Sequence, residues 1–343
     1  MEDKANILVI YTGGTIGMAY NKESGTLKPF DFEQVYRNIP ALENLNCYID
    51  VHSFDPLIDS SNVNPPFWVK LAQVITVNYE KYDGFVVLHG TDTMAYSASM
   101  LSFMLENLNK PVVFTGSQLP MGVTRTDGRD NFINAIEIAS AKSDNTPVVP
   151  EVSIYFENKL FRGNRTNKFN SENFNAFLSG NFPPLAEVGV HIRYHHNYII
   201  KPNFKRLKTH TRFDTNVAIL KLFPGITESV VSSMLNIPGL KALILETYGS
   251  GNAPTDKWFI DVLEDAIKNK DIIIYNVTQC KGGSVEIGKY ETSANLGKIG
   301  VIGGYDITTE SAIAKTMFLL GQGFAKNEVE RLLQVPLRGE MSV

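Results

Sequence analysis

Short runs rich in β-branched residues alternate with longer helical patterns along most of the chain, and this alternation limits what the chain can fold into. In the first half the strand-like runs are ILVIY (7–11), YIDVHS (48–53), GFVVLHG (84–90), PVVFTG (111–116) and VSIYFE (152–157). Between them lie helix-like segments at 65–82, 95–108 and 130–142. Strands that alternate with helices indicate crossover connections over a mostly parallel sheet. We therefore expect an α/β fold.

The alternation lapses once, in a polar and aromatic stretch at 190–216 that has no clear period, and then resumes. The second half holds strand-like runs at 217–223, 242–249 and 271–279, and helix-like segments at 256–270, 310–323 and 327–334. A chain of 343 residues also exceeds the length at which a single core usually stops growing. We predict a large N-terminal domain (1–190), a linker (191–214) and a smaller C-terminal α/β domain (215–343).

Composition excludes some classes of function. The formal net charge is −4 at pH 7, with 43% hydrophobic and 20% charged residues, which is typical of a soluble globular protein. The densest basic run, Lys201, Lys205, Arg206 and Lys208, is short, and we interpret it as a solvated linker. We therefore expect no nucleic-acid partner.

Cysteine usage and hydropathy bear on the compartment. Cys47 and Cys280 lie far apart and form neither a CxxC metal motif nor a disulfide framework, which fits a reducing compartment. The segment MEDKANILVI passes from charged residues directly into a strand-like run and lacks the pattern of a secretory signal. No run approaches the roughly 18 to 20 apolar residues of a membrane helix. The sequence predicts a cytoplasmic protein with no membrane segment.

Polar loops rich in Gly, Ser, Thr and Asp follow four of the predicted strands, which end near Tyr11, Ser53, His89 and Thr115. In α/β sheets, ligands bind at the carboxyl ends of the strands. We therefore expect these four loops to converge on one site.

The first loop carries Thr15 behind two glycines, Gly13 and Gly14. It matches neither the phosphate-binding pattern G-x4-G-K-[ST] nor the dinucleotide pattern G-x-G-x-x-G. The glycines permit a positive φ and the close approach of another backbone, which would leave the Thr15 hydroxyl at the rim of the sheet. The alternative is an ordinary turn in which Thr15 caps a helix.

Two further loops offer groups for acyl transfer. Thr91 and Asp92 place a hydroxyl beside a carboxylate, suited to contact an ammonium group or activate a hydroxyl. Alternatively, Asp92 or Thr93 simply caps the following helix. Lys168 stands among arginines, where it could join a proton relay or belong to a solvated basic face.

The remaining loop residues have simpler alternatives. Asp59, Ser60 and Ser61 could hold the charged groups of a zwitterion, or could be ordinary turn chemistry. His89 precedes the Gly-Thr-Asp loop, but no G-x-S-x-G elbow or metal-ligand spacing accompanies it. We interpret His89 as structural and expect no metal site.

Six motifs come in the order and approximate spacing of one enzyme family. They are TGGTIGM (12–18), DSS (59–61), HGTDTMAYSAS (89–99), TGSQLP (115–120), RGNRT.K (162–168) and YGSGNAP (248–254). In these motifs the chain resembles the bacterial type I L-asparaginases, the cytoplasmic branch of the asparaginase/glutaminase family. The resemblance runs nearly from end to end, and the first and third motifs are highly specific.

The resemblance implies an amidohydrolase that converts L-asparagine to L-aspartate and ammonia through an acyl-threonine intermediate, without a cofactor or metal. Thr15 would be the nucleophile, and Thr91 would lie in a second triad with Asp92 and Lys168. The resemblance also implies a homodimer or homotetramer in which a neighbouring subunit closes each site.

Substrate contacts are implied in the same way. The residues are Asp59, Ser60, Ser61, Thr91, Asp92, Ser117 and Asn252. Asp59, Ser60 and Asp92 would hold the α-carboxylate and α-amino groups of asparagine. Ser117 would approach the side-chain amide through its backbone, and Asn252 would reach in from a partner subunit.

Two positions depart from the family pattern. Many members carry a tyrosine in the loop after the nucleophile, whereas here Thr26 falls near that position and Tyr20 comes too early, so we assign no residue that activates the nucleophile. Some members bind asparagine at an allosteric site through an arginine in the strand before the YGSGNAP motif. This chain has Glu246 there, although Cys280 matches, so the sequence does not predict allosteric activation.

Other functions are compatible with parts of this sequence. A glutaminase-asparaginase acts on a substrate longer by one methylene, which a pocket discriminates only modestly, so this alternative stays open. A catalytically silent amino-acid sensor could use the same pocket but would not need the hydroxyls of both Thr15 and Thr91. A tRNA-dependent amidotransferase subunit of the same fold would carry an added N-terminal domain, which we do not expect because the first motif follows directly after Tyr11.

Overall fold

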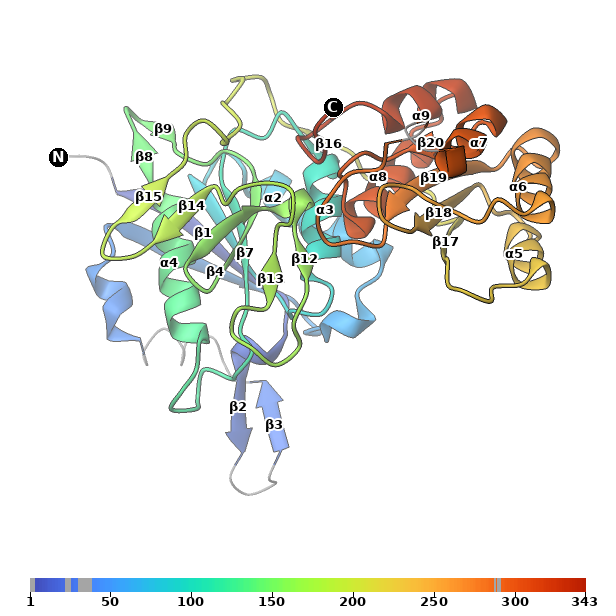
Figure 1. Ribbon diagram of the computed structural model, residues 1–343. Coiled ribbons are helices and arrows are strands. Elements are labelled where there is room, and N and C mark those ends of the chain that lie inside the picture. The colour runs from blue at the N-terminus through green and yellow to red at the C-terminus, as the bar shows by residue number, and fades with distance from the viewer. Residues whose placement is uncertain (1–3, 22–25, 30–38, 287, 289–290) are drawn as a thin grey trace. The chain divides into compact units, whose positions relative to one another are not determined.

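The chain folds into two compact units, each built around its own sheet (Figure 1). The computed structural model describes residues 4–21, 26–29, 39–286, 288 and 291–343. The first unit comprises Met1–Ser179 and Pro183–Thr211, and the second comprises Gly180–Phe182 and Arg212–Val343. Both units combine parallel strands with helices, which confirms the predicted α/β class.

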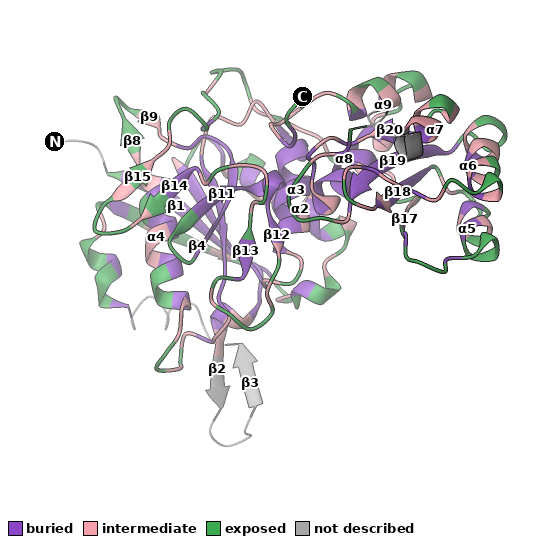
Figure 2. Cartoon of the chain, in the orientation of Figure 1, coloured by how far each residue is buried: buried purple, intermediate pink, exposed green. Residues whose placement is uncertain are grey.

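The first unit contains an eight-stranded sheet in the order β15-β14-β11-β10-β7-β5-β1-β4. Its strands are β1 (Ala5–Tyr11), β4 (Cys47–Ser53), β5 (Gly84–Leu88), β7 (Val112–Thr115), β10 (Val152–Phe156), β11 (Lys159–Arg162), β14 (Ala186–Val188) and β15 (Ile192–Tyr194). The described α-helices of this unit are α2 (Pro65–Asn78), α3 (Met94–Met104) and α4 (Gly128–Ser140). The middle strands are buried, as the sequence pattern of apolar runs requires (Figure 2).

Short elements decorate this sheet. The two-stranded pairs are β2 (Met18–Asn21) with β3 (Thr26–Pro29), β6 (Leu105–Glu106) with β16 (Lys208–Thr209), β8 (Lys142–Ser143) with β9 (Thr146–Pro147), and β12 (Asn167–Lys168) with β13 (Phe177–Leu178). The 3₁₀ turns are η1 (Thr15–Gly17), η2 (Pro40–Asn44), η3 (Ser60–Asn62) and η4 (Gly163–Arg165).

Strand β1 lies where the direction of the strand order reverses. It pairs in parallel with β4 on one side and with β5 on the other, and β5 pairs in parallel with β7. The chain therefore passes from β1 to one side, then crosses to the other through α2. In open α/β sheets the ligand site lies at such a switch point, outside the carboxyl ends of the strands. The loops after β1 and β5 flank this point.

The antiparallel edge of the sheet did not follow from the sequence pattern. Strands β11, β14 and β15 pair antiparallel with one another beyond β10. Strand β15 lies within the segment 191–214, for which the sequence pattern predicts a linker, and β16 in the same segment pairs with β6. These strands have only two to four residues, too few to show a period of two. The exact domain boundaries stay a prediction.

The second unit is built on a parallel sheet in the order β17-β18-β19-β20. Its elements are β17 (Val217–Lys221), α5 (Glu228–Leu235), β18 (Ala242–Thr247), α6 (Lys257–Asn269), β19 (Ile273–Thr278), α7 (Glu291–Ile299), β20 (Ile302–Gly303), α8 (Thr309–Gly321) and α9 (Lys326–Leu333). Phe259 and Leu263 of α6 are buried in one apolar cluster with Leu243 and Leu245 of β18. This cluster forms a core of the second unit.

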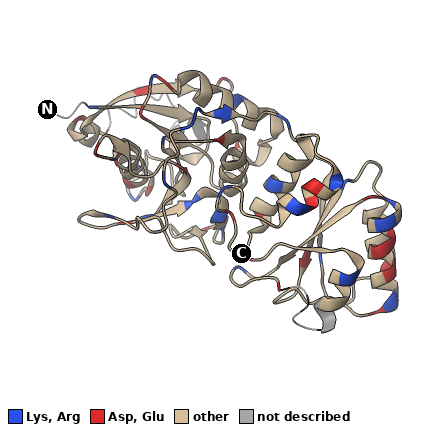
Figure 3. Ribbon diagram, turned by 90° about the horizontal axis from the view of Figure 1, so that it is seen from above, with Lys and Arg blue, Asp and Glu red and all other residues tan. Residues whose placement is uncertain are grey.

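Several features of the described chain bear on function. Acidic and basic residues are spread over both units (Figure 3). Cys47 is buried and Cys280 is exposed, and neither forms a disulfide. Within the described residues, the structure contains no helix long and apolar enough to cross a membrane. The same residues contain no group of three or more His, Cys, Asp or Glu side chains placed to hold a metal ion.

Candidate active site

The glycine turn after β1 lies directly against two other loops. A Cβ added to Gly13 would lie 2.2 Å from the carbonyl oxygen of Ile58, and one added to Gly14 would lie 2.6 Å from the Cα of Gly90. The two glycines also have φ values of 129° and 87°, which side chains rarely adopt. Glycine is therefore required for both conformation and space. Gly14, which precedes Thr15, therefore lies against Gly90, which precedes Thr91.

Similar close approaches join the remaining loops. A Cβ added to Gly90 would lie 2.5 Å from the Ser60 Oγ, and one added to Gly116 would lie 2.4 Å from the carbonyl oxygen of His89. A Cβ added to Gly128 would lie 3.0 Å from the Cβ of Ser117. The loops after β1, β4, β5 and β7 therefore meet at one edge of the sheet, as the sequence analysis expected.

Thr15 is the first residue of η1, and its side chain is partly exposed. Gly14 occupies the N-cap position, and no side chain caps this turn. The alternative in which Thr15 is a capping residue is therefore wrong. Thr15 lies in the glycine turn at the edge where the loops meet.

Lys168 joins the hydroxyl of Thr91 to the carboxylate of Asp92. Its Nζ donates to Thr91 Oγ1 at 2.8 Å and to Asp92 Oδ1 at 2.7 Å. The Lys168 side chain is 16% exposed, so the solvated basic face considered for it is wrong. Thr93 does occupy the N-cap of α3, but its side chain makes no capping bond, and its hydroxyl donates to the Ser60 carbonyl at 2.7 Å. Lys168 lies 77 positions after Thr91 and 76 after Asp92, and the fold brings the three residues together.

The DSS loop holds a carboxylate in its charged form. Asp59 Oδ1 accepts from the hydroxyl of Ser61 at 2.7 Å and from its backbone N–H at 2.8 Å. These bonds, the side-chain bond first, lower the pKa of Asp59, so it is ionised at neutral pH. Asp59 also caps η3, so the turn chemistry considered as an alternative is present. Ser60 is buried beneath Gly90, and Ser61 is exposed.

The loop after β7 contains one predicted residue and one that the sequence analysis did not single out. Ser117 is buried, and its hydroxyl has no hydrogen-bond partner among the described residues. Gln118 follows it, and its Oε1 lies 3.3 Å from Thr91 Oγ1. Its position in the TGSQLP motif was the signal that could have identified it.

His89 is a structural residue, as predicted. Its Nδ1 lies 2.7 Å from the Gly90 carbonyl, and its Nε2 lies 3.0 Å from Ser97 Oγ, which also accepts from Trp68 Nε1. A carbonyl oxygen can only accept, so the proton is on Nδ1 and the Ser97 hydroxyl donates to Nε2. Complete burial lowers the pKa of His89 to about 4. His89 is therefore neutral at physiological pH.

This burial predicts a specific loss of stability in acid. In the unfolded chain His89 has a pKa of 6.5 and becomes protonated below that pH. In the folded chain its pKa is about 4, so it stays neutral until about pH 4. Over that window the unfolded state binds more protons, so the free energy of unfolding falls as pH falls. Between pH 6.5 and 5 the loss due to His89 is about 2 kcal/mol. Urea unfolding of the wild type and His89→Gln at both pH values measures it. Equal pH dependence in the two proteins would contradict this assignment.

Two other residues from the sequence analysis lie in the second unit. Asn252 and Tyr248 form a tight turn after β18, in which Asn252 N–H donates to the Tyr248 carbonyl at 2.8 Å. Glu246 is the residue before the last one of β18, and its Oε1 accepts from the Thr309 hydroxyl at 2.6 Å. The approach of Asn252 to a site on another copy of the chain stays a prediction.

The side chains of Tyr20 and Thr26, named for the loop after the nucleophile, fall outside the described residues. The activator of Thr15 therefore stays unassigned.

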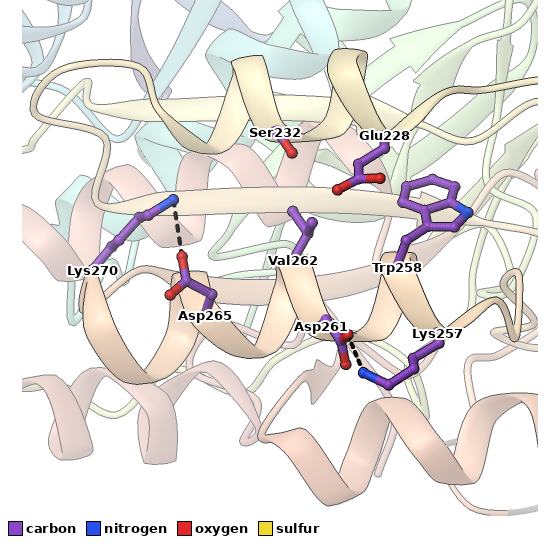
Figure 4. A pocket seen from close by; sticks show the side chains of 8 residues that line it. All are labelled: Glu228, Ser232, Lys257, Trp258, Asp261, Val262, Asp265 and Lys270. Atoms are coloured by element: carbon purple, nitrogen blue, oxygen red, sulfur yellow. Dashed lines mark hydrogen bonds and ion pairs between the residues drawn. The ribbon is translucent and has the colours of Figure 1, made fainter.

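The described part of the chain also contains cavities away from this edge of the sheet. One of about 460 Å³ lies between α5 and α6 and is lined by Glu228, Ser232, Lys257, Trp258, Asp261, Val262, Asp265 and Lys270 (Figure 4). Another of about 620 Å³ in the first unit is lined partly by Asn134 and Glu137 of α4 and by Tyr194 of β15. No residue named for the site lines either cavity.

Comparison with known families accounts for both units. The model for the N-terminal part of asparaginase matches residues 6–200, and the model for the glutaminase/asparaginase C-terminal domain matches residues 216–333. The chain belongs to the asparaginase family. The resemblance to type I L-asparaginases is confirmed by individual members.

The similar proteins span almost the whole chain. L-asparaginase 1 of Escherichia coli K12 is 41% identical over 340 residues, 99% of this chain and 98% of that protein. The crystal structure of L-asparaginase I from Vibrio cholerae superposes with a TM-score of 0.90 at 40% identity, covering 99% of this chain and 100% of that one. The 60 kDa lysophospholipase of Mus musculus is 40% identical over an alignment of 368 residues. The alignment covers 100% of this chain but only 64% of that protein.

Proposed function

We propose that this chain hydrolyses L-asparagine to L-aspartate and ammonia through an acyl-threonine intermediate on Thr15. The observation that carries the proposal is the pair of hydrogen bonds from Lys168 to Thr91 and Asp92, beside the Thr15 turn at the switch point of the sheet. Membership of the asparaginase family and similarity over the full length of L-asparaginases support it. The mouse lysophospholipase matches over only 64% of its length, so we favour the amide reaction over hydrolysis of a lysophospholipid.

In the first step, the Thr15 oxygen attacks the side-chain amide carbon of asparagine. The C–N bond breaks, the hydroxyl proton passes to the leaving nitrogen, and ammonia departs. Backbone N–H groups of the glycine-flanked turns are suited to stabilise the oxyanion, since such donors can contribute about 10²- to 10³-fold in rate. The product of this step is an aspartyl ester of Thr15.

In the second step, water attacks the ester carbonyl and returns a proton to the Thr15 oxygen as aspartate leaves. Thr91 Oγ1 would accept a hydrogen bond from this water, while Lys168 holds Thr91 in place. The Asp59 and Asp92 carboxylates would bind the α-ammonium group of the substrate, and Ser60 its α-carboxylate. We propose a cytoplasmic homodimer or homotetramer in which Asn252 of a neighbouring copy completes the site.

Removing the ammonium group of Lys168 should greatly slow the reaction. In Lys168→Met, Thr91 and Asp92 lose their shared donor, and we expect kcat for asparagine to fall about 10²- to 10³-fold. Asp92 is 65% exposed, so the variant leaves no buried charge and should fold normally. Lys159→Met, an exposed lysine at the start of β11, is the matched control. Steady-state ammonia release measures both, and a Lys168→Met enzyme within twofold of the wild type would contradict the role of Lys168.

Ammonia release by the wild type from asparagine and from glutamine tests the proposed function itself. Release from asparagine at much lower substrate concentration than from glutamine supports an asparaginase. Comparable release from both supports the broader glutaminase-asparaginase. Binding of asparagine without release of ammonia would overturn the enzymatic proposal in favour of a sensor.

A further inference from the structure

Hydrogen bonds to Asp127 fix the main chain of Gln118. Its backbone N–H lies 3.0 and 3.1 Å from the two carboxylate oxygens of Asp127, and the N–H of Leu119 donates to the same group at 3.1 Å. Asp127 stands at the N-cap of α4 and thereby ties this turn to the helix that follows. The Gln118 side chain therefore starts from a rigid anchor.

The orientation of the Gln118 amide is determined by its partners. Its Nε2 donates to the carbonyl oxygens of Ser171 and Asn173, at 3.0 and 3.1 Å. Both partners can only accept, so the NH₂ group must face them and Oε1 must face Thr91. Those carbonyls are themselves ordered, because Asn170 Oδ1 accepts the N–H groups of Glu172 and Asn173 at 2.9 Å each.

This orientation fixes the proton of the Thr91 hydroxyl. Oε1 of Gln118 can only accept, so Thr91 donates to it across 3.3 Å, and bonds of this kind often shorten once substrate is bound. Lys168 occupies one lone pair of Thr91 Oγ1. The Thr91 oxygen has four tetrahedral directions. One is its bond to carbon, one carries the proton donated to Gln118, and one is the lone pair that accepts from Lys168. A single lone pair therefore remains.

We propose that Gln118 is a positioning residue that aims the remaining lone pair of Thr91 at the water which releases aspartate. The inference rests on the proposed function. Gln118 touches neither the nucleophile nor the bond that breaks, and acts through Thr91. It also joins Thr91 to the turn between β12 and β13, and Lys168 is the last residue of β12. The Gln118 amide therefore supports the positions of both Thr91 and Lys168.

Gln118→Met tests this inference, because methionine keeps the length of the side chain and removes the acceptor. We expect kcat to fall about tenfold, the effect of one hydrogen bond of ordinary strength, while KM for asparagine does not rise. The loss should fall on the water step, so the aspartyl ester should accumulate in the first turnover. Mass spectrometry of acid-quenched enzyme measures the ester.

A double-mutant cycle separates positioning from loosening of the loop. If Gln118 acts through Thr91, Gln118→Met should change kcat by less than about twofold in a Thr91→Val background. Thr126→Val, which removes the hydrogen bond from the Thr126 hydroxyl to the Leu119 carbonyl and so weakens the same loop, leaves the Gln118 amide and both of its acceptors in place and should keep kcat near the wild-type value. Fully additive losses in the cycle, or an equal loss in Thr126→Val, would overturn the inference.

The outcome also distinguishes this inference from the proposed function. Wild-type enzyme that binds asparagine and releases no ammonia would overturn both. Active wild type together with fully active Gln118→Met would overturn the inference alone.

Discussion

Replacement of Thr15 by alanine is expected to lower kcat for asparagine by at least about 10⁴-fold while asparagine still binds. The hydroxyl supplies the oxygen of the proposed ester, and a neighbouring group cannot substitute for a bond that must form. The conformation of the turn rests on Gly13 and Gly14 and not on the Thr15 side chain, so the variant should fold. Ammonia release and calorimetric titration with asparagine measure the two effects separately.

A neighbouring threonine provides the matched control. The Thr12 hydroxyl donates to the Leu88 carbonyl at 2.9 Å, and the Thr12 N–H donates to the same oxygen at 3.0 Å. Thr12→Val removes the first bond and leaves the second, which should cost about 1 kcal/mol of stability and leave kcat within a few fold. Thr15→Ser, which keeps a hydroxyl, should retain part of the activity. Thr15→Ala with wild-type turnover would exclude Thr15 as the nucleophile.

Lys315→Met is expected to destabilise the second unit by about 3 to 5 kcal/mol. Lys315 Nζ lies 2.7 Å from Glu340 Oε1, and both side chains are 0% exposed. The ammonium also donates to the carbonyls of Leu333 and Val335, at 3.0 and 2.7 Å. Burial lowers the pKa of Lys315, with Glu340 opposing that effect. Removing the lysine leaves a buried carboxylate without its cation.

The double variant Lys315→Met/Glu340→Gln should recover part of the loss. Glu340 also accepts the N–H groups of Leu337 and Arg338, and glutamine keeps an acceptor for them without the charge. Urea unfolding in a Trp68→Phe background follows the second unit, since Trp258 is then the remaining one of two tryptophans. Lys268→Met, which breaks an exposed i,i+4 pair, should show no measurable change. A Lys315→Met protein as stable as this control would contradict the importance of the buried pair.

The sequence predicted most of what depends on periodicity. The parallel strands and the helices between them came from runs such as 84–90 and 65–82, because buried strands are apolar along their length and helices repeat near 3.6 residues. The convergence of the polar loops followed from the geometry of parallel sheets, since successive strands end at one edge. Strands of two to four residues, such as β14 and β15, carry no detectable period.

Contacts between individual side chains could not be predicted from the sequence pattern. Lys315 and Glu340 are both charged and lie 25 positions apart in the sequence. Lysine and glutamate are usually exposed, so the sequence alone would place both on the surface. The trio of Thr91, Asp92 and Lys168 was named through a family resemblance, and the structure places the three within hydrogen-bonding distance. The sequence did not identify Gln118, because its proposed role depends on the orientation of its side-chain amide. That orientation follows only from the carbonyl groups that lie near it in space.

The identity of the acyl intermediate is the most direct test of the account. Wild-type and Gln118→Met enzymes would be mixed with asparagine, quenched in acid within the first turnover and digested for peptide mass spectrometry. We predict an aspartyl group on the peptide that contains Thr15, with ammonia formed before aspartate. An adduct on the peptide that contains Thr91 would contradict the account. A first turnover in which ammonia and aspartate appear together and neither peptide gains mass would contradict it as well.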